Sequence, residues 1–143
     1  MDSILRISDA ASLGLHAMAY LSNFGHRGPV STGEMAEGLE VSYNHLAKVM
    51  GRLLKAQLVT SKKGPKGGFS LAKPSQEISL LDIYEAVEGP LPRATCLLHR
   101  PVCAPGGCVL GSLLRDVHEQ VAQKLSTTTL EEFRLPQALR SHG

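Results

Sequence analysis

The sequence predicts a mainly α-helical fold that carries one two-stranded β-hairpin. Three observations support this: apolar residues recur at helical intervals over most of the chain, two short strand-like segments flank a glycine-rich turn, and a long apolar stripe follows near the C-terminal end. With 143 residues, 43% of them hydrophobic, the chain can bury the core of one compact domain and extend an arm.

The first two helices are predicted from their N-caps and their apolar spacing. A helix over 8–23 begins with Ser8 as its N-cap. Ser31 and Glu34 then form an S-x-x-E capping box, which opens a short second helix that ends near Leu39.

A third helix follows a tight turn, and Ser42 is its expected N-cap. Its core-facing stripe holds Leu46, Val49, Met50, Leu53 and Leu54, and its outer stripe holds Asn44, Lys48, Arg52 and Lys55. Two short helices joined by a tight turn, the second one basic on its outer face, are typical of the helix-turn-helix, a DNA-binding motif.

A basic hairpin is predicted directly after this pair of helices. Residues 58–62 and 69–72 have strand character, and the turn at 63–68 between them is rich in lysine and glycine. Such a hairpin is a wing, so the predicted architecture is a winged helix-turn-helix. A tip of glycines can enter the narrow minor groove of DNA, where Lys63 or Lys66 would meet a strongly negative potential.

Charge is segregated along the chain. Residues 41–76 hold seven Lys or Arg and no Asp or Glu, a charge of +7, whereas the remaining residues hold eight cations and thirteen acids, a charge of −5. Because such segregation causes self-repulsion unless the basic surface meets a polyanion, a nucleic-acid duplex is the expected partner, and the motif favours double-stranded DNA. A merely solvated basic face is the alternative. Aromatic residues make up only 4% of the chain, which argues against a stacking platform for single strands.

The predicted DNA contacts divide into base-reading and phosphate-binding residues. The first turns of the third helix should reach base edges, and the later cations should reach phosphates, which position the protein but carry no sequence information. The predicted DNA-binding set is Ser31, Ser42, Tyr43, Asn44, His45, Lys48, Arg52, Lys55, Lys62, Lys63, Lys66 and Gly67, with Lys73 as a further phosphate contact.

Two more helices are predicted toward the C-terminal end. Ser79 caps a helix over 80–87, and a long helix over 109–126 carries an apolar stripe. Such a stripe suits a homodimer interface, with packing on its own domain as the alternative. A last short helix is expected through Phe133, and the chain should fray from Leu135 onward. We therefore expect a winged domain over 1–89, a cysteine loop over 90–108, a dimerisation region over 109–135 and a tail over 136–143.

All three cysteines of the chain, Cys96, Cys103 and Cys108, lie within thirteen residues, beside several glycines and prolines. Thiolates are soft ligands, and a short bent loop gathers them at little extra cost in chain entropy. The spacing therefore predicts a metal or iron–sulfur site. A structural zinc site that also uses His99 and a metal-free thiol switch remain as alternatives.

Several classes of protein are not expected. The chain has no signal-peptide pattern and no apolar run long enough to cross a membrane, so we expect a cytoplasmic protein without a membrane partner. It has neither a pairing of nucleophile and base nor a glycine-rich nucleotide loop after a strand, so we expect no enzyme.

The run SYNHLAKVMGRLLKAQLVTSKKGPKGGFSLAKP, followed by ISLLDIYEAVEG and by three cysteines before a long helix, resembles the Rrf-two family of bacterial regulators, which has IscR-like and NsrR-like members. The resemblance extends from ISDAASLGLHAMAYL to TTTLEEF. It implies a homodimeric winged-helix transcription factor, commonly a repressor, that holds a 2Fe-2S or 4Fe-4S cluster in each subunit and senses redox state, nitric oxide or iron–sulfur status.

The resemblance also implies ligands for this cluster. Cys96, Cys103 and Cys108 match the family cysteines, although the gaps here are six and four residues where about five is usual in each. Gly111 occupies the place at which IscR-like members carry a histidine ligand. Asp9 matches an acid of the first helix that is the fourth ligand in some NsrR-like members, and His99 is the local alternative. The other histidines singled out, His16, His26, His118 and His142, are expected to be surface or packing residues.

Overall fold

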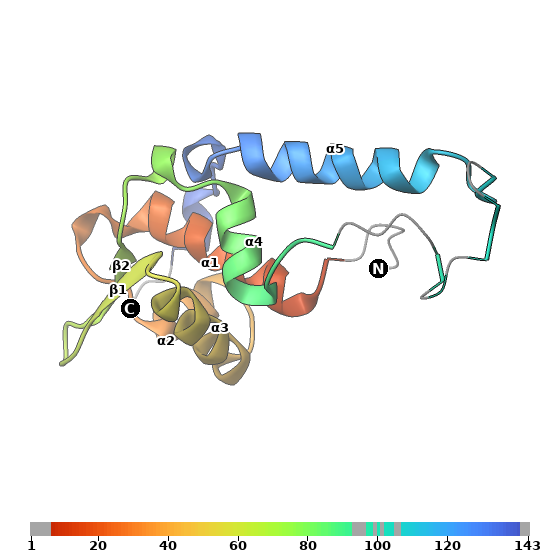
Figure 1. Ribbon diagram of the computed structural model, residues 1–143. Helices are drawn as coiled ribbons and strands as arrows, with labels where there is room; N and C mark the ends of the chain where they lie inside the picture. Colours follow the sequence, from red (N-terminus) through yellow and green to blue (C-terminus); the bar gives the residue numbers. More distant parts are fainter. Residues whose placement is uncertain (1–6, 93–96, 99, 101, 105–106, 141–143) are drawn as a thin grey trace.

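The computed structural model describes residues 7–92, 97–98, 100, 102–104 and 107–140. Its helices are α1 (Asp9–Phe24), α2 (Thr32–Leu39), α3 (Tyr43–Lys55), α4 (Leu80–Glu88) and α5 (Leu113–Thr127), and its strands are β1 (Val59–Lys62) and β2 (Gly68–Leu71). Single 3₁₀ turns occur at Gly25–Arg27, Ser75–Glu77, Leu130–Glu132 and Gln137–Leu139. In Figure 1, α1 to α4 form one group with the β1–β2 hairpin projecting at one side, and α5 extends away from this group as an arm. The predicted mainly helical fold with a two-stranded antiparallel sheet is confirmed.

Serine caps begin four of the five helices, and all four were predicted. The predicted capping box of Ser31 and Glu34 is only half formed, because the Ser31 hydroxyl accepts from the N–H of Glu34 but the described structure has no return bond to the Glu34 carboxylate. The hydroxyls of Ser8, Ser31, Ser42 and Ser79 each accept a hydrogen bond from the backbone N–H three residues later, at 3.0, 3.0, 3.4 and 3.0 Å. The Ser79 cap is a full capping box, because Asp82 also accepts from the backbone N–H of Ser79 at 3.0 Å. These local bonds satisfy helix N–H groups that have no partner within the helix.

The core lies where α1 crosses α3 and α4. The apolar stripe of α3 is buried at Leu46, Val49, Met50 and Leu53, as predicted, and Tyr20 of α1 is wholly buried. Leu54 is a correction, because its side chain is 38% exposed. The buried side of α3 ends with Leu53, and Leu54 lies at the edge of this stripe.

The long C-terminal helix begins later than its apolar stripe predicted. Gly111 has a left-handed backbone with φ of 61°, and its N–H donates to the carbonyl of Cys108 at 2.9 Å. This turn interrupts the expected helix over 109–126, so α5 begins only at Leu113, and Val109 stays 84% exposed before it. No residue of α5 is buried in the described chain.

The chain after α5 is more ordered than expected. Leu130 is wholly buried in a 3₁₀ turn, which replaces the predicted last helix, and Leu135 and Leu139 pack against the core. The expectation that the chain frays from Leu135 is wrong for this part, because these leucines meet apolar surface that the sequence order does not reveal. None of the described helices combines the length and apolarity needed to span a membrane.

Candidate nucleic-acid interface and cysteine loop

The exposed side of α3 carries the predicted base-reading residues. Tyr43 is 57% exposed, and Asn44, His45 and Lys48 are exposed beside it, while the opposite side of the helix is buried in the core. The buried stripe thus turns the polar stripe outward, which leaves donors and acceptors available to a groove. Ser31 and Ser42, both exposed, mark the N-terminal ends of α2 and α3, and such ends favour anionic groups.

Arg52 has a contact that the sequence did not predict. Its Nη1 donates to the carbonyl of Val87 at 3.1 Å, so the guanidinium satisfies a carbonyl in the last turn of α4. The predicted phosphate contact of Arg52 stays a prediction. The guanidinium has further donors, and Lys55 on the same stripe is exposed.

The wing is held in place by its turn and by a bridge to the start of α2. Gly67 donates its N–H to the carbonyl of Gly64 at 2.9 Å, and a Cβ at Gly67 would lie only 2.0 Å from the Lys62 carbonyl oxygen. Val30 and Phe69 exchange backbone hydrogen bonds of 2.9 and 2.8 Å. The wing cations are therefore presented beside the helix-turn-helix, and all of them are exposed: Lys62, Lys63 and Lys66.

The structure describes only some of the predicted cluster ligands. Cys96 and His99 lie outside the described residues. Cys103 is exposed and Cys108 half-buried, and both are free thiols. Among the described residues, no three His, Cys, Asp or Glu side chains are grouped as a metal site. Asp9 is exposed in the first turn of α1.

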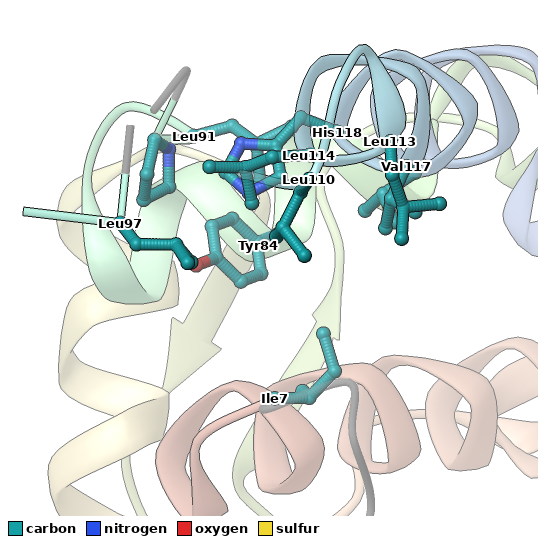
Figure 2. A pocket seen from close by; sticks show the side chains of 11 residues that line it. Ile7, Tyr84, Leu91, Leu97, Leu110, Leu113, Leu114, Val117 and His118 are labelled. Atoms are coloured by element: carbon teal, nitrogen blue, oxygen red, sulfur yellow. The ribbon is translucent and has the colours of Figure 1, made fainter. Parts of the chain in front are cut away.

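An apolar pocket of about 520 Å³ lies between α4, the first half of α5 and the chain that leads to the cysteines. Figure 2 shows Tyr84, Leu110 and Leu114 on one side of the space and Ile7, just before α1, on the other. His118 also lines this pocket, and its Nδ1 is buried without a hydrogen-bond partner among the described residues. The sequence predicted no particular role for His118, and only the packing of α5 over α4 reveals its position.

The start of α5 and the loop before it expose an apolar surface. Leu113 is 55% exposed and Val117 38% exposed, although a helical stripe of this kind is normally covered. Further exposed apolar side chains lie in the adjoining loop at Leu97, Leu98, Val102 and Val109.

Comparison with known proteins agrees with this geometry. Residues 7–134 match the family model Rrf2, described as an iron-dependent transcriptional regulator. The HTH-type transcriptional regulator IscR of Photorhabdus laumondii is 30% identical over 130 residues, which cover 90% of this chain and 79% of that protein.

Two solved structures share the fold. CymR (YrzC), the global cysteine regulator of B. subtilis, has a TM-score of 0.78 and 29% identity over 90% of this chain and 95% of its own. IscR of T. potens has a TM-score of 0.69 and 27% identity over 89% of this chain and 84% of its own. These relatives are regulators and not enzymes, as the sequence predicted. The chain belongs to the Rrf2 family of winged-helix, DNA-binding transcriptional regulators.

Proposed function

We propose that this protein is a homodimeric repressor whose binding to an operator depends on an iron–sulfur cluster held by Cys96, Cys103 and Cys108. The observation that carries the proposal is that one small chain joins an exposed basic reading face, α3 with the wing, to free thiols directly before α5. The proposed sensor loop thus lies between α4 and α5 in the chain.

The donor set fits such a group. Cys103 and Cys108 are unpaired and accessible, and their soft thiolates suit iron. The pocket beside the loop adds His118, whose buried Nδ1 lacks a partner, and a bound group or a rearranged loop could supply one. Asp9 and His99 stay the proposed candidates for a fourth, non-thiolate ligand. The cluster, when bound, would supply redox or nitric-oxide chemistry.

The chain's own residues would turn that chemistry into a change in DNA affinity. The cysteine loop runs directly into α5, so gathering its thiols restrains the start of this helix. If α5 pairs two subunits through its exposed apolar side, the orientation of α5 sets the distance between two copies of α3. Ligation that biases two such geometries by a few kcal/mol changes affinity by tens to hundreds of fold.

Within each reading head, we propose that Tyr43, Asn44, His45 and Lys48 meet base edges. The remaining predicted contacts, at phosphates or in the minor groove, are Ser31, Ser42, Arg52, Lys55, Lys62, Lys63, Lys66, Gly67 and Lys73. The exposure of the cations on one side of α3 and on the wing supports this assignment.

A metal-free thiol switch is the second candidate function. It is favoured by two free thiols in the described loop and by the fold shared with a global cysteine regulator. A two-electron oxidant such as hydrogen peroxide, which is reduced to water, would then join two of the three thiols in a disulfide, and this bond would replace cluster ligation as the signal.

Anaerobic purification with an absorption spectrum and analysis of iron, sulfide and zinc separates these candidates. We expect brown protein with matching iron and sulfide in wild type, and bleached protein in Cys103→Ala. Colourless protein with one zinc per chain would instead indicate a structural zinc site, and colourless metal-free protein with thiol-dependent DNA binding would indicate the switch. Equal binding of one operator by cluster-loaded and cluster-free protein would refute cluster-dependent regulation.

A further inference from the structure

Residues 128–140, which follow α5, contact three helices of the reading unit, the name we give to the group of α1 to α4 with the β1–β2 hairpin. We call residues 128–140 the C-terminal strap. It starts as an antiparallel bridge beside α4, where Leu80 donates its N–H to the Thr128 carbonyl at 3.0 Å and Leu130 donates to the Ile78 carbonyl at 2.8 Å. The strap is therefore attached to the domain from its first residues.

Asn23, in the last turn of α1, holds the middle of the strap. Its Nδ2 donates to the carbonyl of Ala19 at 2.7 Å and to that of Phe133 at 3.1 Å, and its Oδ1 accepts from the N–H of Leu135 at 3.1 Å. One amide side chain thus satisfies two peptide groups of the strap while it is anchored to its own helix. An aliphatic side chain could make none of these bonds.

The end of the strap, at Leu139, packs on α2 at Gly38. A Cβ at this position would lie 2.3 Å from the Leu139 carbonyl oxygen and 2.7 Å from Cε2 of Tyr20. A larger residue at position 38 would overlap these atoms, so the close approach is a physical reason for glycine here. The strap backbone and the Tyr20 ring therefore lie directly against the first helix of the helix-turn-helix.

We infer that the strap is part of the DNA-reading unit and that Asn23 and Gly38 are positioning residues for DNA recognition. Asn23 bonds the strap to the end of α1, and Gly38 lets α2 lie against the strap and the Tyr20 ring. Helix α2 in turn leads into α3 through a turn in which Val41 donates to the Ala36 carbonyl at 3.0 Å. The strap directly follows α5 in the chain, so α5 is connected covalently to the segment that packs on α2. The inference requires only DNA binding from the proposed function, not the cluster.

Two variants and two matched controls test this inference. Gly38→Ala adds one methyl group where the strap backbone lies, and Asn23→Ala removes the three hydrogen bonds without adding volume. Gly25→Ala and Ser22→Ala are the controls, because a Cβ at Gly25 would have only an ordinary contact, 4.0 Å from Leu21, and Ser22 adjoins Asn23. The probe is a duplex that the wild type selects from a random-sequence library, compared with an unselected duplex.

We expect Gly38→Ala to weaken binding of the selected duplex on the order of tenfold and Asn23→Ala somewhat less, while both controls bind as wild type. Affinity for the unselected duplex and the salt dependence should stay unchanged, because the phosphate contacts remain. A variant that was merely less folded would lose both duplexes equally. Binding is measured well below the thermal midpoint of each variant.

Equal loss of both duplexes, or wild-type affinity for both in folded Asn23→Ala, would overturn the inference. Asn23→Ala keeps the test decisive if Gly38→Ala does not fold. A wild type that selects no duplex would instead refute DNA binding itself, so the two failures are distinguishable.

Discussion

The reading unit and the arm of this protein differ in how much of their apolar surface is buried. In the reading unit, α1, α3 and α4 cover each other's apolar stripes and the strap closes the remaining surface with Leu130. In the arm, α5 buries none of its residues, and Leu113 stands 55% exposed. Among the described residues, the reading unit thus covers its apolar surface with its own contacts, whereas the arm leaves apolar side chains exposed. A second copy of the chain is the partner that we propose.

The largest expected effect is on stability, and it tests where the buried core of the reading unit ends. Leu53→Ala removes a wholly buried side chain from α3, so we expect the free energy of unfolding to fall by about 3 kcal/mol. Its neighbour Leu54 is 38% exposed and supplies the control, with an expected loss below about 1 kcal/mol for Leu54→Ala. Urea denaturation measures both values. Similar losses in the two variants would show that the core does not end where the structure places its edge.

A substitution in the arm should change the association of subunits rather than the folding of the monomer. Leu113→Ser removes an exposed apolar group from α5, and a two-fold interface would lose it twice, so we expect the dimer dissociation constant to rise on the order of a hundredfold. Unfolding of the monomer should change little. Sedimentation equilibrium measures the constant, with Glu119→Ser, also exposed on α5, as the control. A dimer that survives Leu113→Ser unchanged would assign the interface elsewhere.

Charge distinguishes the two regions as well. Lys48→Ala should weaken operator binding and, if the side chain contacts a phosphate, reduce the slope of log affinity against log salt by about one unit. Lys124→Ala, with its exposed cation on α5, should leave the slope unchanged. Fluorescence anisotropy over a salt series measures both. An unaltered slope in Lys48→Ala would agree with the proposed contact to base edges alone, and unchanged operator affinity would refute both kinds of contact.

The smallest expected effect concerns the pocket between the two regions. The buried Nδ1 of His118 has no described partner, so His118→Leu in cluster-free protein should raise the free energy of unfolding by about 1 kcal/mol. His16→Leu is the control, because Nδ1 of that exposed histidine already has the Ser12 carbonyl at 2.7 Å. Thermal unfolding under matched conditions compares the two. Destabilised His118→Leu protein would mean that His118 has a partner in solution.

The sequence alone determined the local structure of the reading unit. Its four serine caps, the buried stripe of α3 and the glycine-rich wing depend on residues within a few positions of one another, so their spacing is readable directly. The cysteine spacing and the basic segment likewise reveal candidate chemistry without any fold.

Only the tertiary structure decided how distant segments meet. Three contacts join residues that share no local pattern. They are the hydrogen bond from Arg52 to Val87, the hydrogen bonds of Asn23 to a strap more than a hundred positions later, and the contact of Gly38 with Leu139. The predicted frayed end failed for the same reason, since a leucine near the end of the chain is buried or free according to the surface it meets. Local hydrogen bonds depend on neighbouring residues, but the burial of apolar area depends on which surfaces the folded chain brings together.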